Sequence, residues 1–62
     1  MEKLYTITKD RKRFYVCKYS ENLFSIDRIT KSFGGMVKAF RDLQSLEKWA
    51  KKNGYKRVRK TA

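Results

Sequence analysis

Two groups of lysine and arginine, one of them interleaved with tyrosine, are the residues of this chain whose types and spacing could do chemistry. The first group comprises Lys9, Arg11, Lys12, Arg13, Tyr15, Lys18 and Tyr19. The second places six cations within ten residues: Lys51, Lys52, Lys56, Arg57, Arg59 and Lys60. Cations that neutralise backbone phosphates release condensed counterions, which is the main source of sequence-independent affinity for nucleic acid. Tyrosines beside them can hydrogen-bond phosphates or stack on unpaired bases, and arginine on a sheet face can read guanine in the major groove.

Each group also has a simpler interpretation. Charged turns can be a solvated rim, and tyrosine is common on the outer face of strands. A basic terminus can aid solubility or be attracted to anionic lipid. Gly34-Gly35, near Lys38, could let backbone N–H groups approach a phosphate, but such a pair more often only makes a turn. The sequence predicts nucleic-acid contacts at Lys9, Arg11, Lys12, Arg13, Tyr15, Lys18, Tyr19, Lys38, Lys52, Lys56, Arg57, Arg59 and Lys60.

The charge balance also indicates an anionic partner. The 62 residues include 17 Lys and Arg against 6 Asp and Glu, a formal net charge of +11. A small domain needs a net charge of only about 2 to 8 for solubility. Residues 1–30 hold seven cations and four acids, a balance of +3, whereas residues 31–62 hold ten and two, a balance of +8. The charge is therefore concentrated in the C-terminal half.

The composition argues against catalytic and metal chemistry. The chain has no histidine and one cysteine, so the usual nitrogen and sulfur ligands of zinc and the histidine-based triads are missing. The carboxylates are scattered along the chain: Glu2, Asp10, Glu21, Asp27, Asp42 and Glu47. Gly34-Gly35 is not followed by the Lys-Ser or Lys-Thr of a phosphate-binding loop. We therefore expect no enzymatic activity, no metal and no cofactor.

One helix is predicted from Asp42 to Asn53, because its start, period and stop agree. The carboxylate of Asp42 can accept hydrogen bonds from the first turn, and Gly54 suits the left-handed position after the last turn. Tyr55 can then fold back over Ala50. At helical spacing, one face would hold Leu43, Leu46, Trp49, Ala50 and Asn53. We expect this face, Trp49 included, to be buried in the core.

The strands are predicted to form an antiparallel meander. Leu4–Ile7, Arg13–Tyr19 and Leu23–Ile29 are expected strands, with Gly34-Gly35 as a two-residue hairpin turn before a fourth strand, Met36–Phe40. A fifth, short edge strand carrying Tyr55 and Val58 would follow the helix and fray beyond Arg59; a basic tail is the alternative.

Alternation within these strands predicts two different sheet faces. The helix would pack on the inward residues Tyr5, Ile7, Phe14, Val16, Phe24 and Ile26. Tyr15 and Tyr19 would lie on the outer face, flanked by Arg13 and Lys18. On the fourth strand the sequence does not decide between Val37 with Ala39 and Met36 with Lys38 and Phe40. The fold class is α+β, a meander of three to four strands packed on one C-terminal helix.

The length supports one small domain, residues 1–62, and we expect its last few residues to be disordered. Cys17 cannot form an internal disulfide and fits a small strand residue, so a reducing, cytoplasmic location is expected. No apolar run approaches the roughly 18 residues of a membrane span. A monomer or a weak dimer is expected, because edge strands are exposed.

In element order and basicity the chain resembles the arm-type DNA-binding domains of some phage and transposon integrases. In that family a three-stranded sheet followed by a helix lays its sheet in the major groove. The resemblance includes no residue motif, and the fourth strand departs from the pattern. The charge and the basic, aromatic sheet face, with this analogy beside them, lead us to expect a small nucleic-acid-binding module. It would be an accessory or regulatory factor that docks through this face and the basic C-terminus, on duplex DNA rather than RNA. The alternative is a basic protein-binding inhibitor or adaptor that occupies an acidic or nucleic-acid-binding groove of a larger protein.

Overall fold

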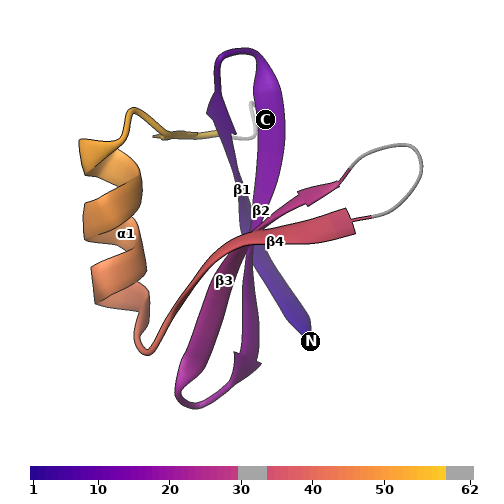
Figure 1. The fold of residues 1–62 in the computed structure, drawn as a ribbon, viewed down its shortest axis with the longest axis vertical. Coiled ribbons are helices and arrows are strands. Elements are labelled where there is room, and N and C mark those ends of the chain that lie inside the picture. The colour runs from indigo at the N-terminus through magenta and orange to yellow at the C-terminus, as the bar shows by residue number, and fades with distance from the viewer. Residues whose placement is uncertain (30–33, 59–62) are drawn as a thin grey trace.

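The computed structural model describes residues 1–29 and 34–58, and it shows an antiparallel sheet packed against one helix (Figure 1). The elements are β1 (Glu2–Lys9), β2 (Lys12–Ser20), β3 (Leu23–Ile29), β4 (Gly34–Phe40), α1 (Leu43–Lys52) and β5 (Lys56–Arg57). The strand order is β4-β3-β2-β1-β5, so the first four strands form a meander and β5 pairs with β1 at its edge. The predicted α+β meander is confirmed.

The ends of α1 are set by the residues that the sequence indicated. Asp42 is the N-cap, and its carboxylate accepts a hydrogen bond of 2.7 Å from the backbone N–H of Ser45. This bond, with a second from the Ser45 hydroxyl, lowers the pKa of the Asp42 carboxyl. Gly54 has a φ of +86°, and the N–H of Tyr55 donates to the carbonyl of Ala50 at 2.9 Å. The helix therefore stops where a residue in the left-handed region is needed.

The core lies between α1 and the facing side of the sheet. Val16, Ile26 and Leu46 are fully buried at its centre, each worth roughly 1.5 to 3 kcal/mol by the burial of apolar surface. The other buried members of this cluster are Ile7, Phe14 and Ala50. Aromatic rings surround it, with Trp49 at 5.7 Å from Phe40 and 5.6 Å from Tyr55 between ring centroids. The inward-facing set and the core role of Trp49 are as predicted.

The predicted hairpin turn at Gly34-Gly35 is wrong. Gly34 pairs with Ile29 and Gly35 with Arg28, so both glycines lie inside β4 and extend its ladder with β3. Glycine tolerates extended backbone as well as turns, so the pair was not diagnostic. The connection between the strands falls on residues 30–33, outside the described part of the chain. The sequence did not decide which residues of the fourth strand face the helix. Lys38 pairs with Ile26, and Phe40 packs against Trp49, so Lys38 and Phe40 face the helix.

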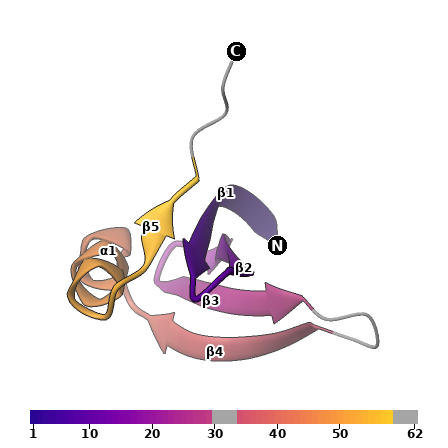
Figure 2. The ribbon, with the colours of Figure 1, turned by 90° about the horizontal axis from the view of Figure 1, so that it is seen from above.

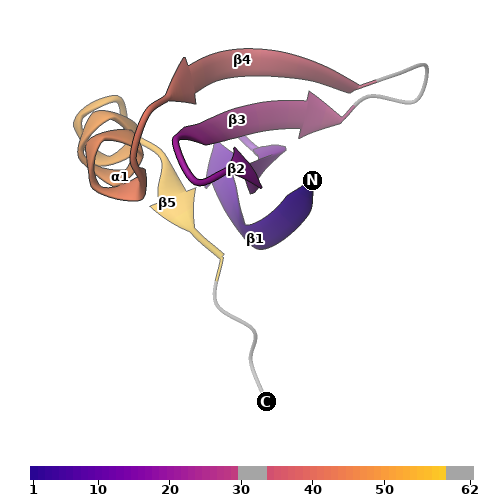
Figure 3. The same ribbon diagram turned by 90° about the horizontal axis from the view of Figure 1, so that it is seen from below.

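The sheet is strongly twisted, and both of its outer long strands are irregular. β4 crosses β1 and β2 at a large angle in Figure 1, and the β3–β4 hairpin extends away from α1 (Figures 1 and 3). A register shift leaves Leu4 as an extra residue on β1, and a second leaves Val37 as an extra residue on β4. Such bulges bend a strand and discourage pairing with another chain.

Candidate nucleic-acid interface

The two groups of cations, far apart in sequence, meet where β5 pairs with β1. Lys56 pairs with Thr8 and Arg57 with Ile7, next to Lys9 at the end of β1. β5 lies between α1 and β1 when the molecule is viewed from above (Figure 2). We call the resulting cluster the basic corner; it comprises Lys9, Arg11, Lys12, Arg13, Lys56 and Arg57. With Asp10 as the one acid in these segments, six positive charges and one negative give a local balance of +5.

The tip of the basic corner is a two-residue hairpin turn. Lys9 pairs with Lys12, and the two residues between them both have positive φ, 54° for Asp10 and 65° for Arg11. This pattern is that of a type I′ turn, which suits the twist of the strands but favours glycine at its second position. An arginine in the left-handed region costs about 1 to 2 kcal/mol. The sequence thus places a cation at the tip at the expense of stability.

Within the described part of the chain, no cation of the basic corner forms an ion pair with an acid. Among the residues that the structure describes, the one ion pair joins Lys18 and Glu21 at 3.6 Å, at the opposite end of β2. The Nζ of Lys9 lies 5.1 Å from the ring centroid of Tyr55, a contact that orients the side chain without cancelling its charge. The corner is therefore a concentrated positive surface.

Tyr15 and Tyr19 lie on the outer sheet face, as predicted, and Asp27 contacts both. Tyr15 opposes Asp27 on this face, and the hydroxyl of Tyr19 donates to the Asp27 carboxylate at 2.5 Å, which raises the pKa of Tyr19. The Ser25 hydroxyl donates to the same carboxylate at 2.7 Å. The Tyr19 hydroxyl is thus hydrogen-bonded to a side chain of the protein itself.

Lys18 does not lie on the outer face, and that part of the prediction is wrong. It opposes Phe24 in the ladder, and its Nζ lies 5.9 Å from the Phe24 ring on the helix side. The alternation that puts Phe14 and Val16 inward puts Lys18 on the same side.

The remaining predicted site residues are dispersed. Lys38 lies on β4, three strands from β1, with its Nζ 5.6 Å from the Trp49 ring. Lys52 is exposed in the last turn of α1. Arg59 and Lys60 fall outside the described residues.

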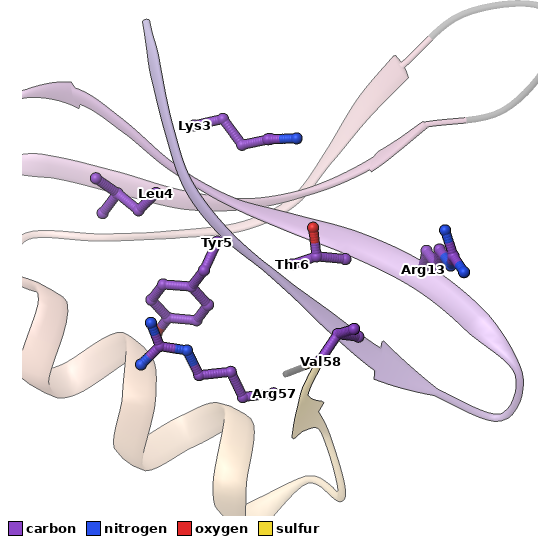
Figure 4. A pocket seen from close by; sticks show the side chains of 7 residues that line it. All are labelled: Lys3, Leu4, Tyr5, Thr6, Arg13, Arg57 and Val58. Carbon is purple, nitrogen blue, oxygen red and sulfur yellow. The ribbon is translucent and has the colours of Figure 1, made fainter. Parts of the chain in front are cut away.

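Sequence reasoning missed Lys3, because the first strand was predicted to begin at Leu4, two residues after the start of β1 at Glu2. Lys3 lies within β1, and its Nζ is 4.6 Å from the ring centroid of Tyr15. It lines a hollow of about 840 Å³ beside the basic corner (Figure 4). The residues around this hollow are Lys3, Leu4, Tyr5, Thr6, Arg13, Arg57 and Val58. Arg13 and Arg57 belong to both the corner and the hollow.

On the helix side of the hollow, contacts through Tyr5 to Glu47 hold the side chain of Arg57 in place. Its guanidinium carbon lies 4.1 Å from the ring centroid of Tyr5, and the Tyr5 hydroxyl donates to Oε2 of Glu47 at 2.8 Å. Burial, together with this hydrogen bond and the nearby Glu47 charge, raises the pKa of Tyr5 well above its ordinary range. The tyrosine thus stays neutral and acts as a flat platform for the arginine.

The other chemistry-bearing side chains are placed as follows. Burial, with Asp27 nearby, raises the pKa of the Cys17 thiol, which is 2% exposed in the middle of β2. Within residues 1–29 and 34–58, no group of three or more His, Cys, Asp or Glu side chains could hold a metal ion. No helix in this part of the chain is long and apolar enough to span a bilayer.

Comparison with known proteins returns no relative. No family model matches the chain, and neither the curated proteins nor the solved structures contain a match.

Proposed function

We propose that the chain is a small nucleic-acid-binding module that docks on duplex DNA through the basic corner. The observation that carries this proposal is the pairing of β5 with β1, which brings two basic segments together at one end of the sheet, where none of their cations forms an ion pair with a described acid. Each phosphate that such a surface neutralises releases counterions and adds affinity. A cytoplasmic accessory or regulatory role fits this size and the buried, reduced Cys17.

The shape of the corner supports a duplex and favours DNA over RNA. The β1–β2 hairpin ends in the turn that carries Arg11, and the major groove of B-DNA admits a two-stranded ribbon. Arginine there can donate two parallel hydrogen bonds to guanine, while Lys56 and Arg57 lie to the side of the hairpin, in reach of the flanking backbone. The major groove of A-form RNA is too deep and narrow for this mode.

The test is the salt dependence of binding to a short duplex, measured by fluorescence anisotropy. If all six cations of the corner contact phosphates, the slope of log K against log salt is about −5, at about 0.9 per phosphate. Replacing Arg11, Lys12 and Arg13 together by Gln should reduce this slope by about 3 and weaken binding at low salt by a factor of 100 or more.

The matched control removes the same charge elsewhere, with Lys18, Lys38 and Lys48 replaced by Gln. Its affinity should fall much less than that of the corner variant, and thermal unfolding should show that both variants fold. Equal losses in the two variants would mean that net charge, not the corner, binds DNA. No binding at the lowest salt would contradict the proposal and favour a protein as the partner of these cations.

A further inference from the structure

The hollow beside the basic corner has two kinds of lining that match the two parts of a nucleotide. Lys3, Thr6 and Arg13 lie on one side of β1, and Tyr5 and Arg57 lie on the other (Figure 4). The first side offers two cations and a hydroxyl, which suit a phosphate. The second offers a planar guanidinium held over a ring, which suits the flat face of a base.

The size and position of the hollow fit a ligand that continues from the corner. Its volume of about 840 Å³ falls within the range of about 300 to 1,000 Å³ that small-molecule sites occupy. Arg13 and Arg57 are shared between the corner and the hollow, so a strand bound at the corner reaches the hollow without leaving the cations.

A peptide strand fits this place less well than a nucleotide. Within residues 1–29 and 34–58, the last backbone contact on the outer edge of β1 is the bond from the Val58 N–H to the Thr6 carbonyl, at 3.0 Å. The extra residue at Leu4, however, bends β1 at this point, and a bulged edge is a poor template for an added strand.

We infer that the hollow binds one unpaired nucleotide next to the duplex, with its base stacked on Arg57 and its phosphate held by Lys3 and Arg13. This inference rests on the proposed function and adds a preference for DNA that has an unpaired end. Tyr5 acts as a positioning residue, because its ring, tethered to Glu47, supports the opposite face of the guanidinium.

The experiment compares three DNAs that share one duplex: blunt-ended, with a short single-stranded overhang, and with an abasic overhang of the same length. The overhang should tighten binding about 5- to 150-fold over the blunt duplex, since stacking on a side chain is worth about 1 to 3 kcal/mol per base. The abasic overhang keeps the phosphates but offers no base to stack. It should therefore lose the part of this gain that comes from stacking and keep the part that comes from its phosphates.

Arg57→Lys is the matched variant, since it keeps the positive charge but replaces the planar guanidinium, on which a base could stack, by an ammonium group. It should bring the ratio of overhang to abasic affinity, measured within the same variant, down to about one, whatever change it causes in the affinity for blunt duplex. Lys3→Gln should instead weaken binding of both overhangs alike. Thermal unfolding checks that each variant keeps its fold.

The outcomes separate this inference from the proposed function. Tight binding to all three DNAs with no preference would overturn the inference and leave the proposed function standing. Displacement of overhang DNA by oligoglutamate as effectively as by unlabelled overhang would also overturn it, because the hollow would then accept any extended anion. Failure to bind any DNA would overturn both.

Discussion

The two edges of the sheet differ in what covers them and in the charge that they carry. At one edge β5 pairs with β1, and the six cations of the basic corner gather there. At the other edge β4 carries one cation, Lys38, and exposes about half of Met36 and Val37, 51% and 44%. Among the described residues, the two edges therefore differ in charge, and the more basic edge is created by a contact between segments far apart in sequence.

The β4 edge shows how the same sheet avoids pairing with other chains. The bulge at Val37 interrupts its ladder, and Lys38 places a charge beside the exposed apolar residues. Bulges and lysines are common ways to blunt an edge strand. The cation on β4 is thus explained by protection of the edge, whereas the corner has more cations than protection requires.

The largest expected effect comes from Tyr55→Ala, which breaks the contact that holds β5 near β1. The Tyr55 ring lies 5.1 Å from Phe14 and 5.6 Å from Trp49, between centroids, and its loss should cost about 2 to 4 kcal/mol of unfolding free energy. DNA affinity should fall as well, because β5 would no longer be fixed beside Lys9. Urea unfolding and anisotropy measure the two effects.

Two controls accompany this variant. Tyr55→Phe keeps the ring contacts and should behave nearly as the wild type. Met36→Ala on the β4 edge should change stability by no more than about 0.5 kcal/mol. If Tyr55→Ala bound DNA normally after losing stability, the junction of β5 and β1 would not matter for binding.

A smaller effect, with opposite signs on stability and binding, is expected at the tip of the corner. Arg11→Gly relieves the left-handed backbone at φ 65° and should raise the free energy of unfolding by about 0.5 to 1 kcal/mol. It should also weaken DNA binding, because the tip cation is lost. Arg11→Ala is the matched control, which loses the charge and keeps the strain. Stabilisation without loss of affinity would show that Arg11 has no role in binding.

The smallest effect on binding is expected at the β4 edge. Lys38→Gln should change DNA affinity by no more than a factor of about 3, since charges farther apart than about 8 to 10 Å are largely screened at physiological salt. Arg13→Gln, which also removes one charge, should weaken binding more. A loss at Lys38 equal to that at Arg13 would move the interface to the helix side of β4.

Local signals in the sequence predicted the elements well. Asp42 and Gly54 marked the ends of α1 because capping depends on neighbouring residues, and alternation predicted which residues of β1, β2 and β3 face the helix. Gly34-Gly35 misled because glycine fits a turn and an extended strand equally, and only the register with β3 decides between them.

The candidate site was predicted in parts and not as a whole. The sequence indicated each basic segment, but the pairing of Lys56 and Arg57 with β1 is a long-range contact that no local pattern specifies. Lys3 lies with Arg13 through the pairing of β1 with β2, but it lies with Arg57 only through the position of β5. Tyr15 and Tyr19 were proposed as binding residues from their type and their neighbours in sequence. The hydrogen bond from Tyr19 to Asp27 depends on cross-strand geometry, which these do not specify.

An NMR titration of the ¹⁵N-labelled protein with a short duplex would show directly whether one corner of the sheet binds DNA. Amide shifts should concentrate at residues 9–13 and 56–57 and reverse on addition of salt. Shifts centred on β4, or spread evenly over the whole sheet and helix, would contradict binding at this corner.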